Sequence, residues 1–233
     1  MIEDLNNQKE KWESQQKIWE EMPFFSIHDK ENILMNWLKQ IPKGKILDEG
    51  CGIGRYTIPL SQLGFDAIGL DFSQKLLDVA KKNAKKYKAK CRFVKGDIRK
   101  LPFKDKTFDA ILSAGTIEHV PETEKAISEL SRILKPKGYL IIHVPHKIST
   151  FTLLKKFQQI FGLWKLGYEK SFSIFGFSNL LSKYNFEILQ MQISEFKAGR
   201  HKFIGKLIQI IDKPLYKLGL GGHQMCFLCQ KSK

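Results

Sequence analysis

The stretch Lys45-Ile-Leu-Asp48-Glu-Gly50-Cys-Gly52-Ile-Gly54 decides how this chain folds. A short apolar run ends in an acid and then in glycines, which is typical of a buried parallel strand that enters a tight loop. Glycine has no Cβ, so the loop can turn sharply and approach a ligand closely, and the first amides of the following helix would face an anion. The spacing is Gly-x-Gly-x-Gly, which differs from the Gly-x-Gly-x-x-Gly fingerprint of dinucleotide-binding proteins.

The alternation of strand and helix continues downstream. Apolar runs predict further strands near residues 67–70, 91–94, 108–112 and 139–144. Helices are expected over 55–63, from a cap at Ser73 to residue 87, and over 122–134, where Pro136 and Gly138 follow. This order predicts an α/β sheet with right-handed crossovers.

Polar residues follow the strands at the points where the strands end. Ligands of such sheets bind beyond the C-terminal ends of the strands. Asp71 closes the second strand, where a carboxylate can take both hydroxyls of a ribose. Asp97 follows the third strand and can accept from an exocyclic amine such as adenine N6, and Ser113 closes the fourth. One such acid alone is often a helix cap, but Asp48, Asp71 and Asp97 together predict a site for an adenosine-containing cofactor.

Composition narrows the class of protein. The chain has 233 residues, of which 42% are hydrophobic and 27% charged, so disorder, a collagen-like fibre and a disulfide miniprotein are excluded. No apolar run reaches the ~18 residues of a membrane span, and the N-terminus does not resemble a secretory signal. Four cysteines fit a reducing compartment. Cys226 and Cys229 lack the further ligands of a zinc site, so we expect no metal and a soluble, cytoplasmic protein.

The formal net charge of +15 is unevenly spread, because residues 151–233 carry 13 basic and 4 acidic side chains. Such a surface attracts phosphates, anionic headgroups or an anionic substrate. An insertion at 197–222 places Phe203, Leu207, Ile210 and Ile211 on one helical face. A basic amphipathic helix of this kind can lie on an anionic membrane, which would make the protein a peripheral membrane protein. It can also lie near a lipid-like substrate, or dock its apolar face on the domain itself.

These motifs together resemble the class I S-adenosylmethionine-dependent methyltransferases. The resemblance is strong over about residues 45–146 and rests on the glycine loop, Gly69-Leu-Asp71-Phe-Ser, Gly96-Asp97-Ile, Phe108-Asp-Ala-Ile-Leu-Ser113, Ile117-Glu-His-Val120 and Leu134-Lys-Pro-Lys-Gly138. The chain looks most like the small-molecule branch that includes the ubiquinone and menaquinone biosynthesis methyltransferases. Toward the C-terminus the similarity is weaker.

The resemblance implies a Rossmann-like, mostly parallel sheet of seven strands in the order 3-2-1-4-5-7-6, with helices on both faces. It also implies a methyltransferase domain (45–233) and a lid (147–175) within that domain. The residues before this domain look helical, with a second helical run near 33–38, and are expected to form an N-terminal helical cap (1–44). Residues that would bind S-adenosylmethionine, and release S-adenosylhomocysteine, are Asp48, Gly50, Gly52, Gly54, Asp71, Phe72, Asp97, Ile98, Ser113 and Ala114.

The reaction expected at such a site is an in-line displacement, in which an O, N or C atom of the acceptor attacks the sulfonium methyl. The enzyme mainly aligns the two partners and excludes water, and a base is needed only when the acceptor must lose a proton. His119 is the best-placed base, in the loop after the fourth strand, and His146 is a weaker candidate at the end of the fifth. His143 lies within the fifth strand and is expected to be a core residue. Aromatic residues of the lid would suit a small hydrophobic or ring-bearing acceptor.

Other functions remain open at this point. The charge of +15 favours an RNA methyltransferase, although the fourth strand lacks the Asn/Asp-Pro-Pro-aromatic motif of amino-directed nucleic-acid enzymes, which makes nucleic acid the weaker partner. A non-catalytic S-adenosylmethionine-binding protein has the same motifs, since fold does not fix function. A nicotinamide oxidoreductase is the remaining alternative. The sequence does not identify the acceptor or the oligomeric state.

Overall fold

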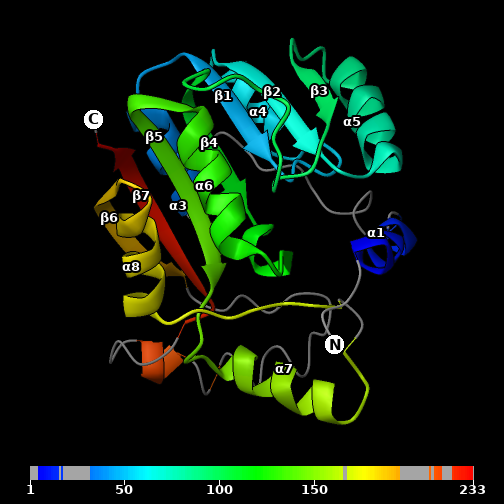
Figure 1. The fold of residues 1–233 in the computed structure, drawn as a ribbon. Coiled ribbons are helices and arrows are strands. Elements are labelled where there is room, and N and C mark those ends of the chain that lie inside the picture. Colours follow the sequence, from blue (N-terminus) through cyan, green and yellow to red (C-terminus); the bar gives the residue numbers. More distant parts are fainter. Residues whose placement is uncertain are drawn as a thin grey trace.

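The computed structural model describes residues 5–15, 17, 32–164, 167–194, 210, 213–216 and 222–232. Seven strands form one sheet: β1 (Lys45–Glu49), β2 (Asp66–Asp71), β3 (Arg92–Lys95), β4 (Phe108–Ala114), β5 (Leu134–Pro145), β6 (Phe186–Ser194) and β7 (Gln224–Lys231). Their order is β3-β2-β1-β4-β5-β7-β6, as expected, and β7 runs antiparallel to both of its neighbours. The predicted Rossmann-like, mostly parallel sheet is confirmed (Figure 1).

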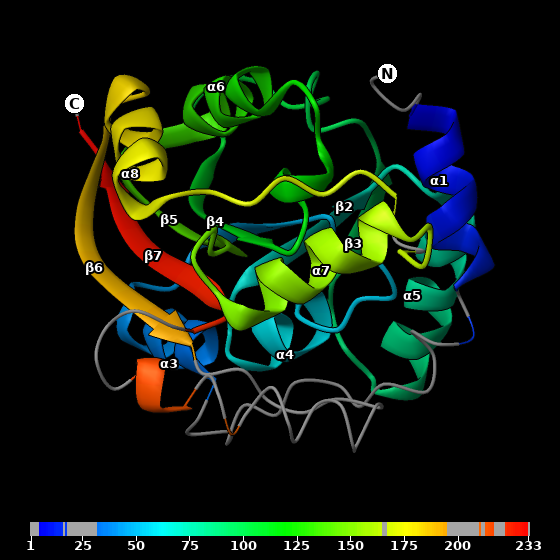
Figure 2. The ribbon, with the colours of Figure 1, turned by 90° about the horizontal axis from the view of Figure 1, so that it is seen from below.

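Helices cover both faces of the sheet. The helices α3 (Ile33–Gln40), α4 (Thr57–Gln62) and α5 (Gln74–Lys86) lie on one side, and α6 (Thr123–Ile133) and α8 (Ile174–Lys183) lie on the other (Figure 2). Strand side chains alternate between the two faces, so Ile46 joins the core beneath α3 and α4, while Leu47 joins the core beneath α6 and α8. Both are completely buried, which fixes the register of β1.

Element boundaries follow local chemistry. Ser73 caps α5 and accepts from the amide of Leu76, as predicted. The fifth strand was expected from residue 139 but begins at Leu134, directly after α6. The extra residues include Lys137 at a φ of 63° and pair with β4 through an irregular register. An irregularity that admits an extra residue is set by the neighbouring strand and has no signature in the apolar pattern.

The N-terminal segment contributes two described helices with different positions. The helix α3, expected near 33–38, joins the hydrophobic core on its side of the sheet and contacts β5 and β7. The helix α1 (Leu5–Ser14) lies apart from the sheet, below α5 (Figure 1).

The predicted lid segment holds α7 (Thr150–Ile160), which crosses beyond the C-terminal ends of the parallel strands (Figure 1). The chain then returns along residues 167–172, where Phe172 pairs with His146 at the end of β5. Most of the insertion predicted at 197–222, including Phe203, Leu207 and Ile211, lies outside the described residues. Among the described helices, none is long and apolar enough to cross a membrane.

Candidate active site

A cavity of about 1230 Å³ opens at the C-terminal edge of the sheet. Its walls come from the loops after β1, β2, β3 and β4, together with α1 and the end of β5. Ligand pockets commonly measure ~300–1000 Å³, so this cavity has room for more than one small molecule. Of the residues predicted to bind a cofactor, eight line it: Asp48, Gly50, Gly52, Asp71, Phe72, Asp97, Ile98 and Ala114.

The glycine loop needs its glycines for two different reasons. Gly50 has a φ of +70°, and a Cβ there would lie 1.9 Å from the Thr116 hydroxyl oxygen, so a larger residue would collide with the loop after β4. Gly52 has a φ of +51°, and a Cβ there would meet nothing within 4 Å. The second glycine therefore leaves open space where the backbone meets the cavity.

Asp71 holds this loop in place. Its two carboxylate oxygens accept from the backbone amides of Gly52 and Ser73, each at 2.9 Å. A carboxylate offers about four acceptor positions, so two remain for hydroxyl donors from a ligand. Burial raises the pKa of Asp71 to about 6, although the amide hydrogen bonds act in the opposite direction.

Two further acids lie side by side at the end of β1 and point to opposite faces of the sheet. Asp48 accepts from the Thr57 hydroxyl at 2.5 Å, and burial raises its pKa to about 7. Glu49 accepts from the Ser113 hydroxyl at 2.8 Å, and burial raises its pKa well above the usual range. With Asp71 they form a cluster of buried acids that favours a cationic ligand, because a bound positive charge would offset the desolvation of each carboxylate.

Asp97 has a different environment. Its carboxylate accepts from the backbone amide and the guanidinium of Arg99, at 2.8 and 2.6 Å, and Arg99 also pairs with Glu122. Burial acts to raise the pKa of Asp97, but the hydrogen bonds from Arg99 outweigh it and the pKa is lowered. Asp97 is therefore a fixed anion at the cavity wall, and Arg99 already donates to both of its carboxylate oxygens.

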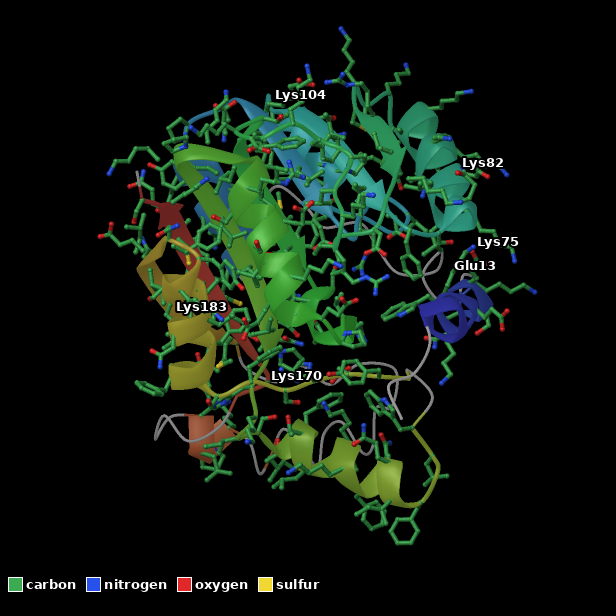
Figure 3. The ribbon with its side chains drawn as sticks, in the orientation of Figure 1. Glu13, Lys75, Lys82, Lys104, Lys170 and Lys183 are labelled. Atoms are coloured by element: carbon green, nitrogen blue, oxygen red, sulfur yellow. The ribbon has the colours of Figure 1, made fainter. Side chains whose placement is uncertain are left out.

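Helix α1 closes one side of the cavity. Trp12 lines it and meets the His119 ring edge-on, with the ring centroids 4.7 Å apart. Glu13 accepts from the Ser73 hydroxyl at 2.8 Å and pairs with Lys75 at 3.1 Å. Figure 3 shows Glu13 and Lys75 facing each other between α1 and α5. These contacts tie the N-terminal helix to the strand end that carries Asp71.

Two histidines face the cavity. The Nδ1 of His119 lies 2.8 Å from the Tyr168 carbonyl oxygen, which can only accept, so Nδ1 carries the proton and Nε2 keeps its lone pair. Burial lowers the pKa of His119. His143 was expected to be a core residue but lines the cavity, and burial lowers its pKa to about 4. Both rings are therefore neutral at physiological pH and can accept a proton.

Three other predicted site residues do not line the cavity. Gly54 makes the turn into α4, donating its amide to the Cys51 carbonyl. The Ser113 hydroxyl is turned toward Glu49, so Ser113 supports an acid and does not itself face a ligand. His146 is 3% exposed, and its carbonyl accepts from the Thr152 hydroxyl at the start of α7.

Sequence reasoning missed Glu49, Arg99 and Thr116 as cavity residues. Glu49 had a usable signal, because a second acid at the end of an otherwise apolar strand is unusual. Cys226 and Cys229 are buried as free thiols in β7.

The cavity suits S-adenosylmethionine, which has two cationic groups, a ribose and an adenine. The buried acids Asp48 and Glu49 match the cations, Asp71 has acceptor positions left for ribose hydroxyls, and the open side of Gly52 admits the amino-acid part. Asp97 and Ile98 stand at the remaining end, where the resemblance places adenine.

Comparison with known proteins gives the same family. A model described as a methyltransferase domain matches residues 47–142. The chain is 32% identical to an uncharacterised protein of Methanocaldococcus jannaschii, over 82% of this chain and 80% of that protein. It is 30% identical to the demethylmenaquinone methyltransferase of Staphylococcus haemolyticus, over 78% of this chain and 70% of that protein. Other curated methyltransferases are matched over 41% to 51% of their length.

A solved structure supports the fold. The structure of an S-adenosylmethionine-dependent methyltransferase from Methanosarcina mazei superposes with a TM-score of 0.64 at 20% identity, covering 86% of this chain and 97% of that one. Sheet order, cavity and sequence similarity agree, so the chain belongs to the class I S-adenosylmethionine-dependent methyltransferases.

Proposed function

We propose that the protein transfers a methyl group by in-line displacement to an O, N or C atom of a small, hydrophobic or ring-bearing acceptor. The observation that carries this proposal is the composition of the cavity walls. Besides the acids and glycines, the lining includes Trp12, Val120, Pro121 and the two neutral imidazoles. These aromatic and apolar walls beside the imidazoles suit a planar, ring-bearing acceptor.

Bound S-adenosylmethionine supplies an activated methyl group, so the chain has to position the acceptor and keep water away. Asp48, Glu49 and Asp71 would hold the cofactor, and the α1 helix would cover it. The curated relative from Staphylococcus haemolyticus is named for demethylmenaquinone, a quinone, which agrees with a ring-bearing acceptor.

His119 is the proposed base for an acceptor that must lose a proton. Its Nδ1–H is fixed by Tyr168, so Nε2 is the atom that receives a proton. His143, on the neighbouring strand end, is a second hydrogen-bonding group for the same acceptor. His146 lies outside the cavity walls, and its proposed role is reduced to supporting α7.

The experiment measures label transfer from methyl-labelled S-adenosylmethionine to a panel of hydroquinones, phenols and amines. We expect hydroquinones or phenols to be labelled and His119→Asn to lower kcat about 100-fold, since the amide can still donate to Tyr168 but has no equivalent of Nε2. S-adenosylhomocysteine affinity should be unchanged. His146→Asn is the matched control and should keep wild-type kcat per folded enzyme.

Two results would count against the proposal. Labelling of tRNA or rRNA in preference to every small acceptor, with activity that falls steeply with salt, would show a nucleic-acid enzyme. A wild-type kcat in His119→Asn would show that His119 is not the base, but it would not contradict the proposed class of acceptor.

A further inference from the structure

Helix α7 turns polar residues toward the protein and apolar residues toward solvent, which is the reverse of the usual arrangement. Its inward face carries Thr152 and Lys155, which are 2% and 3% exposed. Its outward face carries Leu153, Phe157 and Ile160, which are 67%, 54% and 79% exposed. A surface helix normally turns its apolar stripe to the core and its charged residues to solvent. The apolar stripe of α7 is therefore left without a counterpart among the described residues.

A buried ion pair holds the helix in this orientation. The Lys155 ammonium lies 2.9 Å from the Glu169 carboxylate and 2.7 Å from the Ser171 hydroxyl, beneath the helix. The Ser149 hydroxyl caps its first turn by accepting from the Thr152 amide. Rotating α7 to bury its apolar stripe would expose this pair and break its hydrogen bonds, so the outward stripe is a fixed feature of the fold.

The apolar surface continues beyond the ends of the helix. Ile148 before it and Phe161 and Leu163 after it are each at least 60% exposed. Six of the large apolar side chains that stand exposed in the described residues thus fall within 148–163. Figure 3 shows rings that project from the C-terminal half of α7 away from the rest of the molecule. Concentrated apolar exposure of this kind marks an interaction surface.

The charge around the stripe has one sign. No acidic residue occurs between Lys147 and Tyr168, whereas Lys147 and Lys156 are exposed beside the stripe. Exposed Lys170 follows on the returning segment that runs along α7 (Figure 3). An apolar stripe flanked by lysines without acids complements the surface of an anionic bilayer, whose headgroups attract cations and whose acyl chains accept the apolar side chains.

We propose that α7 and its flanks, residues 147–163, dock on the surface of an anionic lipid bilayer. The helix would lie in the plane of the interface with Leu153, Phe157 and Ile160 inserted. The returning segment connects this surface to the active site, because the Tyr168 carbonyl accepts from His119 and the Lys170 amide donates to the Glu118 carbonyl. Docking would therefore place the His119 side of the cavity next to the membrane. Lipid binding itself does not depend on methyl transfer, so it can fail or succeed independently of the proposed function.

The test is flotation of the purified full chain with vesicles of phosphatidylcholine, with and without phosphatidylglycerol. We expect binding to the vesicles that contain phosphatidylglycerol and weak binding to phosphatidylcholine alone. The Leu153→Ser, Phe157→Ser and Ile160→Ser substitutions should each lower the partition coefficient about tenfold, because each removes apolar area from the inserted face. Lys147→Gln and Lys156→Gln should each lower it about fivefold on the anionic vesicles only.

Tyr87→Ser is the matched control, because Tyr87 is an exposed aromatic residue, 42% accessible, at the end of α5. It should bind vesicles as the wild type does. Failure of the wild type to float with anionic vesicles, or wild-type flotation of the three serine variants, would overturn the proposal. A dimer in gel filtration that dissociates in the serine variants would overturn it too, since the face would then be an interface with a second copy of the chain.

Discussion

Replacing Asp71 by Asn tests the residue on which the cofactor site depends most. In the protein the carboxylate accepts from the amides of Gly52 and Ser73 and keeps two acceptor positions for a ribose. An Asn side chain of the same shape has one acceptor oxygen and an NH₂ group that can only donate. One backbone amide then loses its partner, and so does at least one ribose hydroxyl.

The expected loss follows from these contacts. A hydrogen bond to a charged acceptor contributes about 1.5–3 kcal/mol, so losing one such bond to the ribose should weaken S-adenosylhomocysteine binding by about 10- to 150-fold. Without ligand, the Asp71→Asn variant should lose less stability than the loss of one hydrogen bond from a backbone amide alone implies. Burial already raises the pKa of Asp71 to about 6, and the neutral Asn relieves that desolvation cost.

Isothermal titration calorimetry with S-adenosylhomocysteine measures the change in Kd. The matched control is Asp66→Asn, at the opposite end of the same strand, where the carboxylate pairs with Arg92 on the surface at 2.9 Å. That variant should bind as the wild type does. If Asp71→Asn also bound as tightly as the wild type, Asp71 would not hold the ribose and the assignment of the cavity would be wrong.

Further consequences follow from the same structure. S-adenosylmethionine affinity should rise between about pH 5 and pH 8, because the cationic ligand binds the ionised form of the acids. The pKa values of Asp71 and Asp48 in the free protein are about 6 and about 7. If these acids do not face the cations of the ligand, calorimetry will show an affinity that does not change with pH. Without ligand, the free energy of unfolding should fall as pH rises through this range, because burial in the folded protein favours the protonated acids. Denaturant titrations that show the free energy of unfolding rising with pH would contradict the burial of these carboxylates. Lys155→Met leaves Glu169 buried without its partner and should cost about 3–5 kcal/mol, whereas adding Glu169→Gln should recover part of it, as chemical denaturation can measure. Gly50→Ala places a Cβ 1.9 Å from a hydroxyl oxygen at a φ of +70°, so both thermal stability and S-adenosylhomocysteine binding should fall; wild-type values would show that the loop relaxes.

The features that were predicted from the sequence are those that local patterns encode. The strand at residues 45–48 is a short apolar run, and the acids and glycines that follow parallel strands must meet at one edge of the sheet. For this reason Asp48, Gly50, Asp71 and Asp97 could be placed together at a cavity before any distances were known. The strand order came from the family resemblance, because the alternation of elements by itself does not specify how strands are permuted.

The features that escaped prediction depend on pairing between distant residues. His143 faces the cavity because it pairs with Ala114 of β4, and a shift of one residue would turn it to the other face. Ser113 turns away from the cavity because buried Glu49 on the paired strand takes its hydroxyl. Each outcome is set by a neighbour far along the chain, so the local pattern around His143 or Ser113 contains no trace of it.

The outward apolar stripe of α7 has a similar origin. The family resemblance predicted a lid over 147–175, but not which side of its helix would face the sheet. That choice is made by the ion pair between Lys155 and Glu169, which lies between α7 and the returning segment. Basic amphipathic character was predicted for 197–222, most of which lies outside the described residues, and α7 shows an apolar stripe flanked by lysines that was not predicted.

The most direct test of the central assignment is a crystal structure of the protein with S-adenosylhomocysteine. It should show the ribose hydroxyls on the Asp71 carboxylate, the amino-acid part over Gly50 and Gly52, and the adenine beside Asp97 and Ile98. The sulfur should face the part of the cavity that His119 and His143 enclose. Ligand bound with its ribose away from Asp71, or no ligand in the cavity at saturating concentration, would contradict the account.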